Sequence, residues 1–227
     1  MTIAANLAAV RERIHAACRR SGRDATAVRI VAVSKTHPPE AVAEAIAAGV
    51  EAIGENRVQE AAGKRPLVPS TVPWHLIGPL QSNKARLALE TFEVIETVDR
   101  PSIADRLEQL AAARGVRYPV FLEVNIAGEV SKHGVPPAAA RALLEHVATR
   151  CPHLVLQGLM TVPPWSPDPE QVRPHFVALA KLAEQLSILE GVGQLELSMG
   201  MSDDFEVAVE EGAHWVRLGR VLFGQRR

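Results

Sequence analysis

The chain has 227 residues, and we expect residues 1–227 to form one domain, because α/β barrels commonly exceed 200 residues without splitting. Hydrophobic residues make up 47% and aromatic residues only 4%, so the core must be built from Ala, Val, Leu and Ile. Lys and Arg number 25 against 26 for Asp and Glu, and this balance argues against nucleic acid as a partner.

The N-terminal segment, MTIAANLAAVRERIHAACRR, alternates apolar and charged residues. It has no apolar run as long as a signal peptide or a membrane span, so we expect a cytoplasmic protein without a membrane partner. Apolar residues recur at steps of three and four from Ile3 to Ala17, and the pattern stops at Ser21 and Gly22. This pattern predicts one amphipathic helix ahead of the remaining elements.

Short β-branched runs then alternate with Ala-rich helical stretches, an order that predicts parallel strands joined by crossover helices. The predicted strands are residues 28–34, 52–54, 74–78, 94–98, 120–125, 155–161, 195–198 and 215–219. The predicted helices between them are residues 39–48, 57–64, 84–89, 101–114, 137–149, 169–189 and 204–211. Eight such strands favour a closed (β/α)₈ TIM barrel over a doubly wound sheet, which usually has five or six strands and often a GxGxxG turn, absent here.

Lys35 ends the first predicted strand, in VAVSKTHPPE, and should emerge at the mouth of the barrel. Partial desolvation there lowers the pKa of an amine, and a neutral amine condenses with an aldehyde. On this segment alone, a surface lysine at a strand end is an equally good interpretation.

The segment LELSMGMSDDFEVAVEEGAHWVRLGRVLFG is the most informative stretch of the chain. Its first strand ends in small residues at 198–200, before a helix that Ser202 or Asp203 could cap. The last strand ends at Gly219 and runs into a helical turn at 220–223. Because barrels often bind phosphate in the loops after strands seven and eight, this pattern predicts a phosphate site. The alternative is that the glycines only permit tight turns.

Arg217 lies two residues before Gly219 on the same face of the last strand and should point into the barrel. A buried guanidinium needs a partner, and Glu196 on the neighbouring strand is a candidate. A structural ion pair is the alternative interpretation of this arginine.

In a closed barrel, Lys35 is two strand spacings, on the order of 10 Å, from Ser198. A flat phosphorylated aldehyde could span that gap, with its aldehyde on Lys35 and its ring over the last strand. Its phosphate would then lie at Ser198, Ser202 and Gly219, with Arg217 at the pyridine nitrogen.

Six segments carry a resemblance to a known family: VAVSKTHPPE, IGENRVQE, WHLIGPLQSNK, LQGLMTVPP, LSMGMSDDFEVAVEEG and VRLGRVLFG. Across nearly the whole chain they resemble the pyridoxal phosphate homeostasis proteins, whose fold resembles the N-terminal barrel of alanine racemase. The resemblance implies that pyridoxal 5′-phosphate (PLP) is bound covalently as a Schiff base on Lys35, with Arg217 at the pyridine nitrogen. It further implies a phosphate cradle formed by Ser198, Met199, Gly200, Ser202 and Gly219. Asn56 and Met160 would line the ring pocket.

Arg220 departs from the family pattern, which often has a hydroxyl residue after the glycine. The backbone amide survives this change, whereas a hydroxyl donor is lost and a cation is gained. Arg220 either pairs with the phosphate or points to solvent, and both alternatives remain open.

The permanent charge of Arg217 discourages protonation of the pyridine nitrogen and disfavours transaminase-like chemistry. Racemisation needs a second acid/base group, and neither Tyr118 nor His75 supplies one. Tyr118 precedes strand five at the opposite end of the barrel, and His75 opens strand three. We therefore expect no catalytic residues. Cys18 and Cys151 lack CxxC spacing, so we expect buried structural thiols and no metal site.

As the family resemblance implies, the expected function is PLP homeostasis: a monomer that holds this vitamin B6 cofactor and controls its supply, with apo PLP-dependent enzymes as recipients. One alternative is a weak PLP-dependent amino-acid racemase or lyase. A more distant one is a Schiff-base aldolase that uses Lys35 on a phosphorylated sugar.

Overall fold

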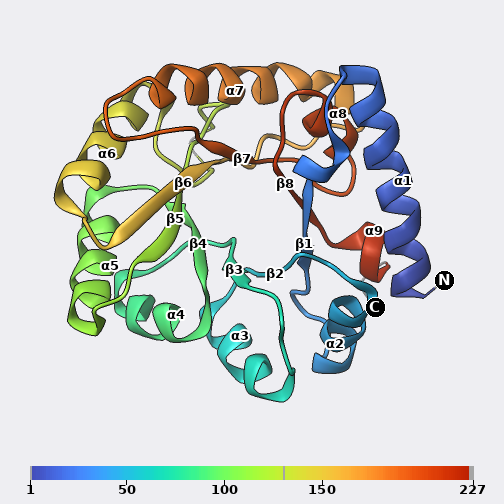
Figure 1. The fold of residues 1–227 in the computed structure, drawn as a ribbon, viewed down its shortest axis with the longest axis horizontal. Helices are drawn as coiled ribbons and strands as arrows, with labels where there is room; N and C mark the ends of the chain where they lie inside the picture. Colours follow the sequence, from blue (N-terminus) through green and yellow to red (C-terminus); the bar gives the residue numbers. More distant parts are fainter. Residues whose placement is uncertain (1, 130, 225–227) are drawn as a thin grey trace.

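Eight parallel strands form a closed barrel in chain order, with helices around the outside (Figure 1). The computed structural model describes residues 2–129 and 131–224. The barrel closes through pairing of the first strand with the last, in the register Arg29 with Trp215 through Ala32 with Leu218. The predicted (β/α)₈ barrel is therefore confirmed.

The strands lie close to the predicted runs. They are β1 (Arg29–Val33), β2 (Ala52–Glu55), β3 (Trp74–Leu76), β4 (Val94–Val98), β5 (Tyr118–Glu123), β6 (Leu154–Met160), β7 (Glu196–Ser198) and β8 (Trp215–Leu218). β5 starts two residues earlier than predicted, because Tyr118 and Pro119 pair with Leu154 and Val155 of β6. Tyr118 therefore belongs to the strand, at the end where the strand begins, and its hydroxyl donates to the carbonyl of Phe92.

The helices of the described residues also follow the prediction. They are α1 (Ile3–Ser21), α2 (Pro39–Ala48), α3 (Val58–Lys64), α4 (Ala85–Thr91), α5 (Pro101–Arg114), α6 (Pro137–Arg150), α7 (Arg173–Ser187), α8 (Phe205–Glu210) and α9 (Arg220–Phe223). The predicted helix 169–189 is shorter than expected. Its start is a separate 3-10 turn, η4 (Pro169–Gln171), which the Asp168 carboxylate caps by accepting from the Glu170 amide.

The extra N-terminal helix α1 packs against α2, α8 and α9 on the outside of the barrel (Figure 1). The Thr2 hydroxyl accepts from the Ala5 amide at its start, and Gly22 adopts a left-handed conformation at its end. The apolar stripe from Ile3 to Ala17 is buried, as the spacing predicts. Among the described residues, no helix combines the length and apolarity needed to cross a bilayer.

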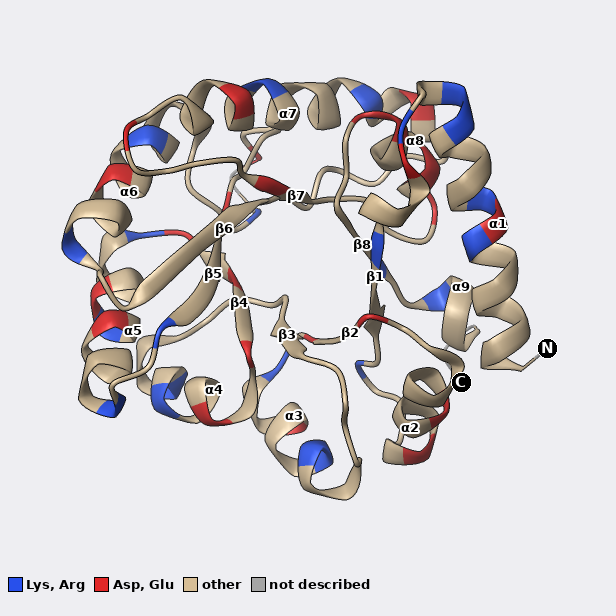
Figure 2. Ribbon diagram, in the orientation of Figure 1, with Lys and Arg blue, Asp and Glu red and all other residues tan. Residues whose placement is uncertain are grey.

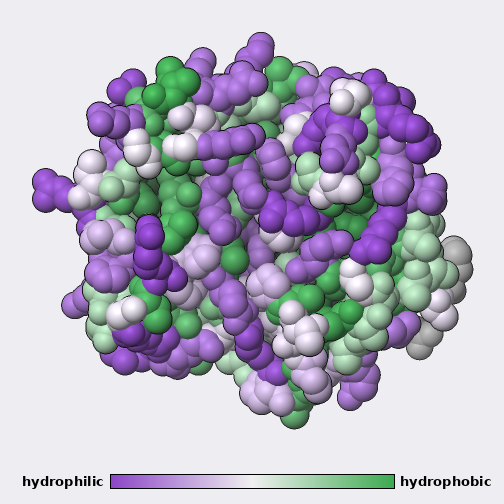
Figure 3. All heavy atoms as spheres, in the orientation of Figure 1, coloured by the Kyte–Doolittle hydropathy of each residue, from purple (hydrophilic) through white to green (hydrophobic). Residues whose placement is uncertain are grey.

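The hydrophobic core has two parts. The larger part lies between the strands and the outer helices. A smaller apolar cluster fills the barrel interior and consists of Val31, Ala52, Val94, Phe121, Met160 and Trp215. Charged residues occur on strands of the ring as well as on the outer helices (Figure 2). In the space-filling view, hydrophilic residues gather over the centre of the ring (Figure 3).

Candidate functional site

A cavity of about 300 Å³ opens where the strands end, at the mouth of the barrel. This is the face on which (β/α)₈ barrels carry their functional residues. The cavity is lined by Val33, Lys35, Asn56, Ile77, Val162, Trp165, Met201, Ser202, Asp203, Asp204, Arg217, Gly219 and Arg220. Six of the predicted binding residues thus share one wall: Lys35, Asn56, Ser202, Arg217, Gly219 and Arg220.

Lys35 lies just beyond β1, half-buried, and lines this cavity as expected. The preceding residue, Ser34, is fully buried. The following residue, Thr36, has a left-handed backbone with φ of 68°. The backbone therefore turns sharply directly after the lysine.

Arg217 points into the barrel from β8, as the strand alternation predicts, and is buried. Its Nη1 donates to Ser198 Oγ at 2.8 Å and its Nη2 donates to the Thr161 carbonyl at 2.6 Å. The prediction that Glu196 is the partner of Arg217 is wrong. Glu196 lies at the beginning of β7, near the opposite end of the barrel, where it pairs with Arg29 and accepts from Trp215 Nε1 at 2.8 Å.

A polar network continues from Arg217 across the barrel interior. Ser198 Oγ donates to Glu96 Oε2 at 2.5 Å, and Glu96 Oε1 lies 2.6 Å from His75 Nδ1. Burial alone would raise the pKa of Glu96, but the hydrogen bond and charge of His75, with the charge of Arg217, hold it below its usual value. His75 is the middle residue of β3, and not its first residue as predicted. Its contact with Glu96 makes it part of this network.

The residues predicted for the phosphate cradle, together with Met160 of the predicted ring pocket, divide into two groups. Ser202 and Gly219 line the cavity, and Ser202 Oγ accepts from the Val221 amide at 3.4 Å. The predicted helix cap is wrong, because Asp204, and not Ser202 or Asp203, precedes α8, and its carboxylate accepts from the Met201 amide at 2.6 Å.

The second group is Met160, Ser198, Met199 and Gly200, which lie outside the cavity lining as far as it is described. The Ser198 hydroxyl is used by Glu96 and Arg217. Met160 belongs to the interior cluster, and a Cβ on Gly200 would lie 2.5 Å from Ala208 Cβ, so Gly200 packs tightly against α8. Their roles in binding a cofactor stay predictions.

Arg220 forms an ion pair at the rim of the cavity. Its Nη2 donates to Asp203 Oδ2, and the same oxygen accepts from Trp165 Nε1 at 3.0 Å. Trp165 is 69% exposed, so the pair ties an exposed aromatic ring of the loop after β6 to the start of α9. In this structure the guanidinium thus has a protein partner.

Asn56 follows β2 and is one of the residues that line the cavity. Its Oδ1 is buried and bonds none of the described residues. A buried polar atom without a partner is costly, so a donor group on a bound molecule would stabilise it.

Sequence reasoning missed Glu123, the last residue of β5. Phe121, two residues earlier, belongs to the interior cluster, so Glu123 also faces inward. Its Oε2 is buried and bonds none of the described residues. Burial raises the pKa of Glu123 to about 7. The negative charge of Asp99 adds to this rise, and the positive charge of Arg217 opposes it. A carboxyl with this pKa can both hold and release a proton at neutral pH.

Asp105, His146 and Cys151 come together on the outside of the barrel, with ligand atoms within 4.8 Å of one another. His146 Nε2 lies 2.6 Å from Asp105 Oδ1. Burial, with the charges of Glu108 and Asp105, raises the pKa of Cys151 to about 11, which favours the thiol over the metal-binding thiolate. Cys18 and Cys151 are both buried and free of disulfide bonds, as expected.

Comparison with known proteins identifies the family to which the chain is similar. Residues 5–227 match the family of the alanine racemase N-terminal domain. The pyridoxal phosphate homeostasis protein of Pseudomonas aeruginosa is 47% identical over 226 residues, which cover 99% of this chain and 96% of that protein. That of Aquifex aeolicus is 41% identical over 228 residues, 100% of both chains. PipY of Synechococcus elongatus, solved with PLP bound, is 37% identical with a TM-score of 0.85, over 98% of this chain and 100% of that chain.

Proposed function

The chain belongs to the pyridoxal phosphate homeostasis protein family, and we propose that it binds PLP as a Schiff base on Lys35 and controls the supply of this cofactor. The observation that carries the proposal is the placement of Lys35 and Arg217 on the wall of one cavity at the barrel mouth. The relative PipY, which was solved with PLP bound, supports it.

The residues present fit this cofactor. The cavity of about 300 Å³ is at the lower end of the range for small-molecule sites. The buried Asn56 Oδ1 needs a donor. A Cβ on Gly219 would lie 3.4 Å from the Val33 carbonyl oxygen, so the backbone at Gly219 lies close to β1. Ser202 adds a hydroxyl on the same wall.

Each residue has a role in the proposal. Lys35 supplies the amine that forms the covalent bond, and Ser202 and Gly219 lie where the phosphate would be held. Arg217 presents a fixed positive charge to the pyridine nitrogen. When bound, PLP supplies an electron-withdrawing ring that can stabilise negative charge at an amino-acid α-carbon. Because Arg217 cannot donate a proton at neutral pH, it weakens that property and favours storage over turnover.

We also propose that the protein works as a cytoplasmic monomer that delivers PLP to apo-enzymes. The two thiols without a disulfide suit a reducing compartment.

The test is Lys35→Ala, with visible absorbance and thermal unfolding measured on the same samples. The variant should lose the absorbance of the Schiff base, whereas its unfolding temperature should stay within about 2 °C of the wild type, because the residue is not part of the core. Lys181→Ala, at an exposed position of α7, is the matched control and should keep the absorbance. An unchanged visible band in Lys35→Ala would remove Lys35 from this role.

Glu123 gives a specific reason to keep the weak racemase as a second candidate. Its carboxyl group titrates near neutrality inside the barrel and could serve as an acid or base in addition to Lys35. It lies outside the described cavity lining, however, so the carrier function is favoured.

A further inference from the structure

A buried polar cluster lies behind Lys35. Its centre is Lys64, the last residue of α3, whose side chain is 11% exposed. The ammonium group donates to the Ser34 carbonyl oxygen at 2.8 Å, to Glu55 Oε1 at 2.8 Å and to Glu60 Oε1 at 2.7 Å. Since a lysine has three donors, this cluster uses all of them.

The cluster holds the residues on both sides of Lys35. On one side, the Ser34 hydroxyl donates to Glu55 Oε1 at 2.7 Å, in addition to the bond from Lys64 to the Ser34 carbonyl. On the other side, the Thr36 amide donates to Glu60 Oε1 at 2.6 Å. Side chains from β2 and α3 therefore fix the backbone immediately before and after the lysine.

Thr36 shows why the backbone needs to be held. Of the non-glycine residues that the structure describes, it alone has a positive φ, 68°. A β-branched residue adopts this conformation rarely, and it persists only when the surroundings enforce it. Two contacts hold this turn: the His37 amide donates to the Ser34 carbonyl oxygen at 3.0 Å, and the Thr36 amide donates to Glu60 Oε1 at 2.6 Å.

The cluster also has a high desolvation cost for a contact between a helix and the barrel. It takes one ammonium and two carboxylates largely out of water, and apolar side chains of similar size often stabilise a protein as well. Glu55 Oε2 even remains buried without a partner among the described residues. Burial raises the pKa of Glu55, although the hydrogen bonds from Lys64 and Ser34 act to lower it. A costly cluster beside a functional lysine indicates a role at that lysine.

We propose that Glu60 and Lys64 are positioning residues, which hold the backbone from Ser34 to Thr36 so that the Lys35 amine is presented to the cavity. The inference rests on the proposed function, in which Lys35 binds PLP. It adds that the geometry of this lysine is set by a neighbouring helix.

The experiment compares Glu60→Ala and Lys64→Met with two matched controls at exposed positions of α7, Glu184→Ala and Lys181→Met. Each protein is freed of PLP, and the rate of Schiff-base formation with added PLP is followed by visible absorbance from pH 6 to 9. The thermal unfolding of each apo-protein is measured in parallel. We expect Glu60→Ala and Lys64→Met to form the Schiff base at least tenfold more slowly, with a displaced pH profile, and the controls to match the wild type.

A purely structural role predicts a different result. In that case the two variants unfold at lower temperature, but the folded fraction forms the Schiff base at the wild-type rate with the wild-type pH profile, and this outcome would overturn the proposal. Lys35→Ala, measured alongside, separates the two ideas. If Lys35→Ala keeps the visible band, the proposed function fails. If it loses the band while Glu60→Ala and Lys64→Met load normally, only the positioning role fails.

Two further measurements keep the proposal testable if Lys64→Met does not fold. The first is hydrogen exchange at the Thr36 amide of the apo-protein, which should be slow although Thr36 is exposed, and at least tenfold faster in Glu60→Ala. The second is a rescue. Because glycine adopts a positive φ readily, Thr36→Gly should restore part of the rate lost in Glu60→Ala. Equal exchange in the two proteins, or no rescue, would contradict a role through the backbone.

Discussion

Glu123 places a carboxyl group inside the barrel with one oxygen that no described residue bonds. Burial raises its pKa to about 7, from an ordinary value of 4.5. The protonated form is therefore favoured in the folded chain. The contribution of Glu123 to the free energy of unfolding is fully present below about pH 4.5. It is lost as pH rises through 7, which lowers the free energy of unfolding by about 3 kcal/mol.

Glu123→Gln, which is neutral at every pH, should remove this dependence. The free energy of unfolding of the apo-variant should equal that of the wild type near pH 4.5 and exceed it by about 3 kcal/mol at pH 8. Urea unfolding at several pH values measures the difference, and groups common to both proteins cancel. Parallel curves for the two proteins would show that Glu123 titrates normally.

At the scale of single elements, β6 and β7 meet at a glycine. Gly158 pairs with Glu196, and a Cβ at Gly158 would lie 2.0 Å from the Glu196 carbonyl oxygen and 2.8 Å from Phe121 Cε1. These contacts are far inside van der Waals distance, and a backbone atom cannot swing away. The two strands can therefore approach each other only if residue 158 has no side chain.

Gly158→Ala should thus destabilise the barrel by about 3 kcal/mol or more, because the strands must separate. Gly63→Ala is the control, because Gly63 lies in α3 with open space around its Cα. Alanine there should raise the free energy of unfolding by up to about 1 kcal/mol. Chemical denaturation of both variants gives the comparison. Equal stability of the two would mean that β6 and β7 tolerate a wider spacing.

The sequence predicted these elements well because local signals determine them. Apolar spacing located α1, prolines marked the starts of α2, α5 and α6, and β-branched runs located the strands. Strand alternation also directed Arg217 inward.

The partners of the site residues could not be predicted in the same way. Glu196 and Ser198 both face the barrel interior, and only the register of β7 against β8, in which Ser198 is opposite Trp215, decides that Ser198 reaches Arg217. The cluster around Lys64 joins α3 to residues 9 and 30 positions away, which no local pattern specifies.

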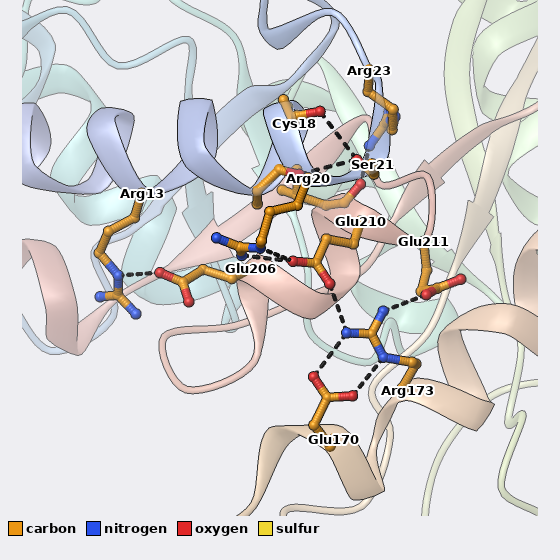
Figure 4. A network of polar contacts seen from close by, with 12 residues as sticks. Arg13, Cys18, Arg20, Ser21, Arg23, Glu170, Arg173, Glu206, Glu210 and Glu211 are labelled. Carbon is orange, nitrogen blue, oxygen red and sulfur yellow. Dashed lines mark hydrogen bonds and ion pairs between the residues drawn. The ribbon is translucent and has the colours of Figure 1, made fainter.

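At the scale of the whole molecule, a network of ion pairs joins α1, α7 and α8 (Figure 4). Arg173 binds Glu170 and Glu210, each at 2.6 Å, and also Glu211, while Glu210 pairs with Arg20 of α1 at 2.6 Å. The helices that surround β7 and β8 are thereby tied to the extra N-terminal helix. The Arg173 side chain is 28% exposed, so its contribution is screened only in part.

Arg173→Ala should lower the free energy of unfolding by about 1 kcal/mol, because three carboxylates lose a shared cation. The loss should shrink in 1 M salt, at which the screening length is about 3 Å. Arg141→Ala, which breaks an exposed pair with Glu145, should have little effect. A loss that is the same at low and high salt would show that Arg173 acts through packing instead of charge.

The molecule as a whole should bind PLP without turning over amino acids at rates typical of enzymes, roughly 1–1000 per second. In the proposed binding mode Arg217 lies at the pyridine nitrogen and weakens the ring as an electron sink. Tyr118 donates to the Phe92 carbonyl at the far end of the barrel. Glu123 remains as an interior carboxyl whose burial raises its pKa to about 7, but it lies outside the described cavity lining.

Solvent-deuterium exchange at the α-carbon of alanine and other amino acids, with chiral analysis of the products, separates the functions. We expect at most slow exchange without inversion, because Lys35 can serve one face only and a second acid is needed for the other. Rapid inversion would replace the carrier function with a racemase. In that case Glu123→Gln should abolish inversion while exchange persists, and inversion that survives this change would place the second acid on another residue.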